Sequence, residues 1–277
     1  TFFEPVSLPS VLNMMNMDAL IIPELQELSH KLAEPALNFG VPAVYLACTL
    51  GGYAIMRPVA KPFVIPDWFK LCYNVFQVSL SMYCVVLGMP VVADFINKPF
   101  GIGLPIDESG PEGKYLHYCI CIHYLSKFVD YVDTLLIVLR KADKQLSVLH
   151  VYHHCTISMV WGYLIHINMA YGTICFGAWI NAVIHSIMYS YYAFTVLKLG
   201  IAKLIKVWVT RVQLIQFFSC ITHAIAVMVA EKQISFELAS LQFGYHCTMI
   251  ALFGQFYISN YSRKSKEKKV AKEAKSK

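Results

Sequence analysis

The sequence predicts an all-α membrane protein with seven transmembrane helices. Of its 277 residues, 57% are hydrophobic and only 14% are charged, and the mean hydropathy is +0.53. Soluble domains carry about 25% charged residues, so this composition indicates a polytopic membrane protein. Seven apolar segments are each long enough to span about 30 Å of hydrocarbon as a helix. They cover residues 39–56, 69–92, 115–139, 146–167, 172–197, 207–230 and 235–259.

The loops between these segments alternate in charge. Those after the first, third and fifth segments are net positive, the one after the second is net negative, and the other two carry no net charge. Because cytosolic loops are enriched in Lys and Arg, this pattern predicts seven crossings with a non-cytosolic N-terminus and a cytosolic C-terminus. We therefore expect an N-terminal segment 1–38, a seven-helix domain 39–261 and a basic cytosolic tail 262–277.

The composition of the N-terminal segment and the charge of the C-terminal tail indicate which partners to expect. Residues 23–38 can form a short amphipathic helix. The N-terminal segment lacks a basic stretch followed by an apolar stretch, so we expect no signal peptide. The net charge of +6 is located in the tail, where eight Lys or Arg and two Glu lie between Arg263 and Lys277. Such a tail is typical of a membrane-surface segment, so we expect no nucleic-acid partner.

Three histidines share one face of the fourth segment. At 100° per helical residue, His153 lies about 60° to one side of His150 and His154 about 40° to the other. Lipid penalises polar rings on one stripe, so this face should look into a protein interior or a wet cavity. The alternative is a set of buried structural histidines that hydrogen-bond to neighbouring helices.

Three further segments carry polar stripes. The spacing of Lys127 and Asp130 (i, i+3) allows an ion pair. Each stripe also has a structural alternative: an ion-paired bridge, an interfacial aromatic belt, or glutamines that bind helices together. Because ionisable groups at membrane depth are functional candidates, we expect the four stripes to enclose one polar cavity that opens to the cytosol near residues 140–145. The additional stripes comprise Lys127, Asp130, Asp133 and Thr134; Asn181, His185, Met188, Tyr189, Tyr191 and Tyr192; and Gln213, Gln216, Cys220 and His223.

Four motifs in this order resemble the signatures of the ELO/ELOVL fatty-acid elongases, the 3-ketoacyl-CoA synthases of the endoplasmic reticulum. They are Lys127-x-x-Asp130-x-x-Asp133-Thr134, His150-x-x-His153-His154, Asn181-x-x-x-His185-x-x-Met188-Tyr189-x-Tyr191-Tyr192 and Thr210-x-x-Gln213-x-x-Gln216-Phe217. The resemblance runs from about Asn74 to Tyr261. One departure is Asp130, where the family usually has Glu, which moves the carboxylate about 1.5 Å (one C–C bond) closer to the backbone.

The resemblance implies a fold and a reaction. Helices two to seven would enclose a long, narrow acyl tunnel. An acyl-CoA would condense with malonyl-CoA, releasing CO₂ and leaving a 3-oxoacyl-CoA two carbons longer, with no cofactor and no metal. The form of the histidine box favours a polyunsaturated or very-long-chain substrate. The residue types suit this chemistry, since imidazole can act as nucleophile or base and a group of imidazoles, amides and Lys can stabilise an enolate.

By analogy with the family, we expect a ping-pong reaction in which His153 takes the acyl group as an acyl-imidazole. His154 and His150 would orient it or move protons, and Asn181 and His185 would bind the malonyl carbonyl or the enolate. Cys155 is a rival nucleophile on the opposite side of the helix. Lys127 and Asp130 would set the local field, and the other supporting residues are Asp133, Thr134, Tyr189, Tyr192, Gln213 and Gln216.

The basic loops are candidates for binding the CoA phosphates, although lysines in such loops also serve topology alone. The residues concerned are Arg140, Lys141, Lys144, Lys203 and Lys206. The resemblance implies acyl-CoA, malonyl-CoA and the lipid bilayer as partners, with other elongation-cycle enzymes or a second copy of the chain as further candidates. It places the protein in the endoplasmic-reticulum membrane.

Two other classes of protein compete with this interpretation. A membrane di-iron desaturase or hydroxylase also uses HxxHH boxes, and imidazole is a good iron ligand. Such an enzyme needs about eight clustered histidines, whereas one box is present here and the remaining histidines stand apart. Those isolated residues are His30, His117, His123, His166, His223 and His246. A seven-helix lipid transporter is the non-enzyme alternative, but the inverted repeats and broken helices typical of transporters are not evident.

Overall fold

The protein is all-helical over the residues that its computed structural model describes, which are 21–89, 111–170, 174–230 and 236–258. Residues 1–20, most of the negatively charged loop and the basic tail lie outside this part. Each of the apolar segments is mainly helical over its described residues. The described helices are α2 (Pro23–Ala33), α3 (Pro35–Met56), α4 (Asp67–Leu87), α6 (Pro111–Val129), α7 (Tyr131–Leu139), α8 (Val148–His166), α9 (Cys175–Val196), α10 (Ile201–Ala230) and α11 (Phe236–Tyr257).

Two prolines set the bounds of the N-terminal helices. Pro23 opens α2 and Pro35 opens α3, at the position where a missing N–H costs nothing. A residue before proline is disfavoured in the helical conformation, and Glu34 has a ψ of 137°. The amphipathic helix expected over 23–38 is therefore wrong at its C-terminal end, because α2 ends at Ala33.

The third apolar segment is also interrupted, although its pattern predicts one helix over 115–139. α6 ends at Val129 and α7 begins at Tyr131, with Asp130 as a turn between them. The N–H of Asp133 bonds to the carbonyl of Asp130 at 3.1 Å, a tighter i→i+3 contact. Short 3₁₀ stretches inside a helix often mark functional positions, and this one holds a residue of the first motif.

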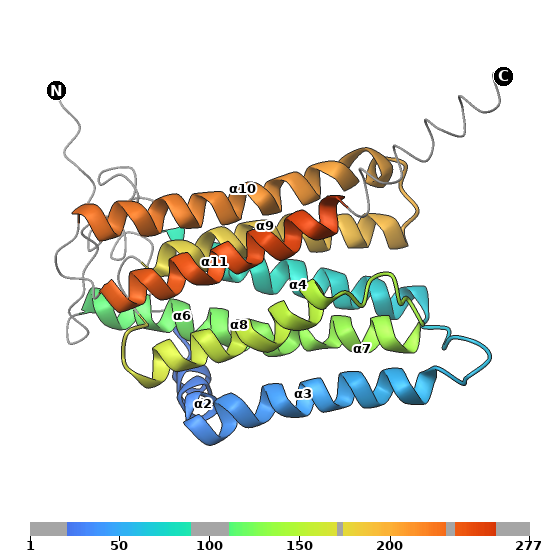
Figure 1. The fold of residues 1–277 in the computed structure, drawn as a ribbon, viewed down its shortest axis with the longest axis horizontal. Helices are drawn as coiled ribbons and strands as arrows, with labels where there is room; N and C mark the ends of the chain where they lie inside the picture. Colours follow the sequence, from blue (N-terminus) through green and yellow to red (C-terminus); the bar gives the residue numbers. More distant parts are fainter. Residues whose placement is uncertain (1–20, 90–110, 171–173, 231–235, 259–277) are drawn as a thin grey trace.

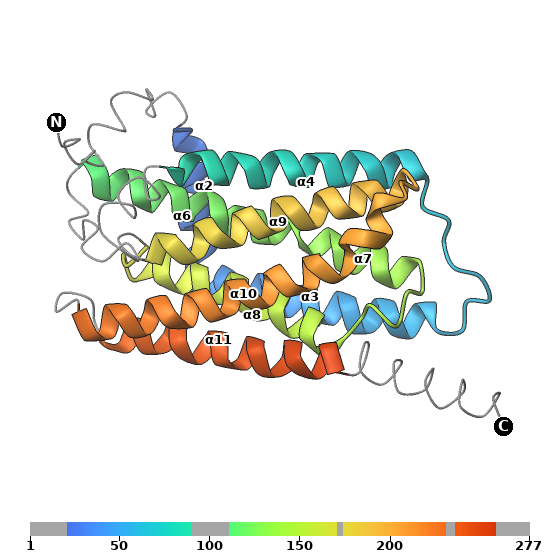
Figure 2. The same ribbon diagram turned by 90° about the horizontal axis from the view of Figure 1, so that it is seen from above.

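The helices other than α2 run along the long axis of the molecule, and α2 lies across them (Figure 1). Contacts between neighbours form a closed ring, in which α4 packs on α9, α9 on α10, α10 on α11, α11 on α8, α8 on α6 and α6 on α4. α3 lies outside this ring against α7 and α8, at the lower edge of Figure 1, and Figure 2 shows the same bundle from above. The consecutive helices α6 and α7, joined at Asp130, are called the α6–α7 rod below. The polar stripes of this rod, of α8 and of α9 therefore all belong to one ring.

Three described helices are long and apolar enough by themselves to cross a membrane: Pro35–Met56, Asp67–Leu87 and the stretch Ile201–Val229. Their outward faces expose large apolar side chains, among them Ile55, Trp68 and Leu204. Exposed apolar surface of this extent is expected where lipid is the solvent. The protein is therefore membrane-embedded. Polar residues lower the hydropathy of other helices, as Asn181 and His185 do in α9.

The positively charged loops lie together at one end of the molecule. The connections that follow α3, α7 and α9 meet there, beside the C-terminal end of α11 (Figure 1). The N–H of Phe63 donates to the carbonyl of Leu139 at 3.0 Å, which ties the first of these loops to the end of α7. The three net-positive loops of the sequence therefore lie at the same end of the bundle.

Candidate active site

Lys127 and Asp130 form the buried ion pair that their spacing predicts. Nζ of Lys127 lies 3.3 Å from Oδ2 of Asp130, and the side chains are only 2% and 3% exposed. A buried pair is tolerated when its remaining donors and acceptors are also satisfied. Nζ of Lys127 also donates to Oδ1 of Asn181 at 3.0 Å, which brings α9 into the same group.

The Asp130 carboxylate joins three helices. Its Oδ1 accepts from Nε2 of Gln77 on α4 at 2.9 Å and from the hydroxyl of Tyr189 on α9 at 3.0 Å. Its Oδ2 lies 3.8 Å from Nδ1 of His185. The turn between α6 and α7 places the carboxylate where α4, α6 and α9 meet. Although Asp is shorter than the Glu usual in the first motif, it reaches all of these partners.

Tyr189 lies between two carboxylates and is fully buried. Its hydroxyl is 2.5 Å from Oδ2 of Asp133 and 3.0 Å from Oδ1 of Asp130. A hydroxyl has one proton to donate, so the two acceptors compete for it and the shorter contact is to Asp133. Tyr192 packs its ring on Tyr189 with centroids 5.9 Å apart and is itself partly exposed. Of the two tyrosines, only Tyr189 belongs to the buried network.

His150 anchors the histidine box to α7. The side chain of Ser147 caps α8 by accepting from the N–H of His150 at 3.1 Å, which places His150 in the first turn. Nε2 of His150 lies 2.8 Å from the hydroxyl of Thr134, and that hydroxyl is 3.0 Å from the hydroxyl of Tyr45 on α3. His150 is therefore oriented by a chain of polar groups that begins outside the ring.

His153 and His154 complete the box in different ways. Nδ1 of His153 lies 3.3 Å from the hydroxyl of Tyr245 on α11. The ring of His154 contacts both neighbours, with centroids 4.3 Å from His150 and 5.5 Å from His153. Its Nδ1 is buried and has no hydrogen-bond partner among the described residues. The three imidazoles thus form one continuous group.

The histidine box and the Lys127 group face the same interior. The electrostatic neighbours of His153 include Lys127, His185 and Asp130, and those of His154 include Asp130 and His185. Imidazoles from α8 and α9 therefore converge on one ion pair. Cys155 turns the other way, since its Sγ lies 4.0 Å from the carbonyl of Pro42 on α3.

A small cavity adjoins the ion pair. It has room for about one water molecule and lies between α4, α6 and α9. Polar groups make up much of its wall. The lining residues are Gln77, Ser81, Cys84, His123, Ser126, Lys127, Asp130, Ala182 and His185.

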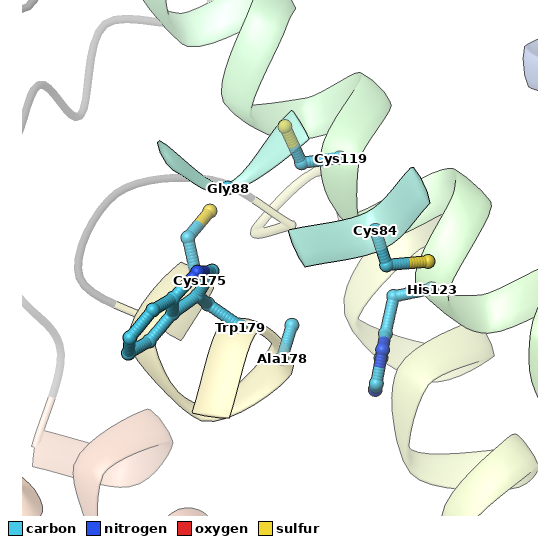
Figure 3. Close-up of a pocket in the computed structure, with 7 residues that line it drawn as sticks. All are labelled: Cys84, Gly88, Cys119, His123, Cys175, Ala178 and Trp179. Atoms are coloured by element: carbon cyan, nitrogen blue, oxygen red, sulfur yellow. The ribbon is translucent and has the colours of Figure 1, made fainter. Parts of the chain in front are cut away.

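A second cavity adjoins the first, and Figure 3 shows the residues that line it. Cys84 and His123 line both, so the two spaces share a wall. Trp179 and Gly88 lie at the far side of this cavity, and a Cβ at Gly88 would overlap the indole of Trp179. Glycine is therefore required there for the close approach of α4 to α9. Nε1 of Trp179 and Nε2 of His123 are buried without a hydrogen-bond partner among the described residues.

The glutamines of α10 lie farther from the ion pair. Nε2 of Gln213 contacts Sδ of Met188 on α9 at 3.5 Å, and Gln216 is buried. Gln213 thus supports the helix that carries His185 and does not itself touch the ion pair. This placement fits a role in holding α10 against α9.

The basic residues proposed for CoA lie at the end of the bundle where the positive loops meet. Lys144, Lys203 and Lys206 are exposed. Nζ of Lys141 instead donates to the carbonyls of Val59 at 2.7 Å and Arg57 at 3.2 Å, and Nε of Arg140 donates to the carbonyl of Leu136 within its own helix. Lys141 therefore already has a structural role in holding the loop after α3.

Sequence reasoning missed several residues of the site. Gln77 and Tyr245 contact the ion pair and the histidine box, and His123 lines both cavities. Two signals could have found them. His123 lies four residues before Lys127 and so shares its helix face. Gln77 belongs to a polar stripe on α4 with Asn74, Ser81 and Cys84. Tyr245 has no comparable signal in its own segment.

The chain is similar to known proteins over most of its length. Residues 32–269 match the family model ELO, described as the GNS1/SUR4 family. Fatty acid elongase 5 of Leishmania major is 40% identical over 201 residues, which are 72% of this chain and 76% of that protein. Fatty acid elongase 4 of Trypanosoma brucei brucei is 37% identical over 68% of this chain and 70% of its own. Very long chain fatty acid elongase 4 of Homo sapiens is 38% identical over 73% and 68%, respectively.

Proposed function

The chain belongs to the ELO (GNS1/SUR4) family of fatty-acid elongases, and from this premise we propose that it is the condensing enzyme of fatty-acid elongation. It joins a long-chain acyl-CoA to malonyl-CoA and releases CO₂ and a 3-oxoacyl-CoA. The observation that carries this assignment is the convergence of the histidine box with Lys127, Asn181 and His185 inside one ring of helices. A nucleophile and a site for an enolate then face the same space.

We propose seven crossings for the fold, with the α6–α7 rod counted as one. The ring of α4, α6–α7, α8, α9, α10 and α11 is the acyl-binding unit, and α3 packs outside it. The basic loops would face the cytosol, which is where acyl-CoA substrates are supplied. This orientation rests on the positive-inside rule. Membership of the elongase family supports the membrane of the endoplasmic reticulum as the proposed location.

The first half-reaction is acyl transfer to His153. In the reactive tautomer the proton is on Nδ1 and is donated to the Tyr245 hydroxyl. The lone pair of Nε2 is then free to react. Nε2 attacks the thioester carbon, the C–S bond breaks, and CoA leaves as the thiol after it receives the proton that His153 loses. That proton sits on Nδ1, so the Tyr245 hydroxyl, 3.3 Å away, is placed to relay it, and His154 packs beside the His153 ring and orients it.

The second half-reaction forms the new carbon–carbon bond. Malonyl-CoA loses CO₂ and becomes an enolate, which attacks the acyl carbon and releases the His153 imidazole after it regains a proton. An enolate oxygen needs fixed donors. Lys127 and Asn181 supply an ammonium and an amide side by side, since they bond to each other at 3.0 Å. The Asp130 carboxylate pairs with Lys127 at 3.3 Å and holds its side chain in place.

The acyl chain is proposed to extend from the ion pair through the two adjoining cavities toward Trp179. Each cavity has room for about one water molecule, so an alkyl chain enters only when α4, α6 and α9 or their side chains move apart. Thiols of Cys84, Cys119 and Cys175 line the far part, where they serve as small apolar groups. Trp179, which packs against Gly88, then closes the cavity and limits the length of the acyl chain.

Condensation by purified protein tests the assignment. The full chain in detergent, given an acyl-CoA and labelled malonyl-CoA, should release CO₂ and form a 3-oxoacyl-CoA. His153→Ala should lower the rate at least about 100-fold, because it removes the nucleophile. Cys155→Ala is the matched control, since this neighbour points toward α3, and its activity should stay near that of the wild type.

Labelling separates the two nucleophiles. Protein incubated with acyl-CoA alone and then denatured should carry an acyl group on His153, and Cys155→Ala should retain that label. A label that Cys155→Ala loses and His153→Ala keeps would overturn the role given to His153. Failure of the wild type to condense any acyl-CoA in a panel of lengths would overturn the assigned reaction.

A further inference from the structure

A second group of histidines lies outside the candidate active site, where α2 crosses α6. In the sequence, His30 and His117 stand apart from every motif, yet their Nε2 atoms lie 3.0 Å from each other. Cys121 follows His117 by four residues and so shares its face of α6. The three ligand atoms, Nε2 of both histidines and Sγ of Cys121, lie within 4.8 Å of one another.

The two imidazoles bring their Nε2 atoms together, with the ring centroids 4.9 Å apart and the ring planes inclined by 21°. A tetrahedral Zn²⁺ with Zn–N of about 2.0–2.1 Å holds two imidazole nitrogens about 3.3 Å apart, which differs from the observed separation by a few tenths of an ångström. Sγ of Cys121 lies within 4.8 Å of the imidazole ligand atoms and has to approach by at most about 1 Å to complete three ligands.

Hydrogen bonds on either side of this group keep α2 in register with α6. The N–H of Ile22 donates to the hydroxyl of Tyr118 at 2.9 Å, and the hydroxyl of Tyr124 donates to the carbonyl of Leu32 at 3.0 Å. They bracket His30 on one helix and Cys121 on the other. The backbone of α2 is thus held against α6 at both ends, so the ligand atoms are brought together before any ion binds.

The group is accessible and separate from the condensation chemistry. His30 is exposed, whereas His117 and Cys121 are buried, so an ion can enter from the α2 side. His117 and Lys127 are ten residues apart on α6, about 15 Å along the helix axis. Imidazole and thiolate ligands together suit Zn²⁺, and carboxylate-preferring ions such as Mg²⁺ or Ca²⁺ do not fit this set.

We propose that His30, His117 and Cys121 form a Zn²⁺ site that clamps α2 onto α6, with the fourth position open to water. The ion replaces the Cys121 proton and accepts a lone pair from each imidazole Nε2. Its proposed role is to hold α2 on α6, because its ligands come from both helices and no residue of the acyl-transfer site lies among them. The site does not depend on the condensing activity.

Metal analysis of the full-length protein tests this site. Protein purified in detergent with a histidine-free affinity tag is loaded with Zn²⁺, desalted and measured by mass spectrometry. The wild type should hold about one Zn²⁺ per chain, and Zn²⁺ should raise its thermal unfolding midpoint. His117→Ala and Cys121→Ser should lose the ion and the stabilisation. Cys119→Ser, a buried thiol two residues away, and His166→Ala, an exposed histidine on α8, should retain both.

Co²⁺ gives a readout that needs no variant. Co²⁺ bound in place of Zn²⁺ by the wild type should show the thiolate-to-metal charge-transfer band that a cysteine ligand produces. A wild type that holds no Zn²⁺ above the level of a metal-free control, or a Co²⁺ complex without that band, would overturn the site. In either case His30 and His117 are simply a hydrogen-bonded pair of neutral imidazoles. Full Zn²⁺ content in Cys121→Ser would overturn it equally.

Discussion

The interior of the helix ring has two regions that are built on opposite principles. Around Asp130, the polar side chains bond to one another across α4, α6 and α9 at distances between 2.9 and 3.3 Å. Around Gly88 and Trp179, the wall consists of thiols, an indole and an alanine, and two buried ring nitrogens have no partner among the described residues. The hydrogen-bonded region around Asp130 resists structural change, whereas the region around Trp179 contains buried polar atoms without a hydrogen-bond partner among the described residues.

This difference corresponds to two tasks. The proposed acyl transfer needs polar groups held within a fraction of an ångström, and the hydrogen bonds and ion pair around Asp130 supply such preorganisation. Binding alkyl chains needs a space that adapts, and a region with few hydrogen bonds opens at lower cost. The comparison predicts that substitutions near Asp130 alter rate and stability together, and that substitutions near Trp179 alter selectivity with less effect on either.

The largest effect should come from Asp130→Ala. It leaves the Lys127 ammonium buried without its counter-ion, which costs about 3–5 kcal/mol in comparable buried pairs. Condensing activity should fall to background, and the thermal unfolding midpoint in detergent should drop sharply. Calorimetry and the condensation assay on one preparation measure both.

Asp130→Glu is the matched control, because it keeps the charge and restores the residue usual in this motif. One extra methylene in a packed site costs about 1–3 kcal/mol, so a partial loss is expected. An Asp130→Ala protein as stable as the Glu variant would show that the network is not the rigid region described above.

Part of this arrangement could be predicted from spacing within single helices. The Lys127–Asp130 pair follows from an i, i+3 separation, and the shared face of the three box histidines follows from the helical repeat. The partners contributed by other helices could not be predicted. Gln77 is 53 positions from Asp130, and Tyr245 is 92 positions from His153. Those contacts depend on how each helix is rotated against its neighbours, which periodicity does not determine.

The break between α6 and α7 at Asp130 could not be predicted from the sequence either, for a different reason. Apolar residues continue on both sides of Asp130 within residues 115–139, and one residue in a turn changes neither the length nor the average polarity of the segment. The meeting of His30 with His117 and Cys121 was hidden too, because it requires α2 to lie across α6. Sequence patterns predicted the faces and the ends of the bundle, and packing determined the partners.

An intermediate effect, confined to selectivity, is expected from Trp179→Leu. The smaller side chain opens the end of the second cavity, so products should become longer by one two-carbon cycle or more while the rate stays within about tenfold of the wild type. Product profiles from a panel of acyl-CoAs, read by mass spectrometry, give the answer. Trp68→Leu, an exposed tryptophan at the start of α4, is the control and should leave the profile unchanged.

Gly88→Ala sharpens the same test from the opposite helix. Its methyl group would displace the Trp179 indole, so the profile should change although no residue near the ion pair is altered. Identical profiles for the wild type, Trp179→Leu and Gly88→Ala, with activity retained, would show that the acyl chain ends elsewhere.

The smallest effect is expected from Tyr45→Phe, at the outer end of the chain that orients His150. The substitution removes one hydroxyl, which bonds to Thr134 at 3.0 Å, while the Thr134–His150 contact at 2.8 Å remains. A single hydrogen bond contributes about 0.5–1.5 kcal/mol, so the unfolding midpoint should fall by a few degrees and the rate by less than about tenfold. Tyr53→Phe alters an exposed tyrosine of the same helix and should change neither quantity. A loss of rate as large as that of Asp130→Ala would mean that α3 belongs to the catalytic network, and the boundary between the ring and its outer helix would have to be redrawn.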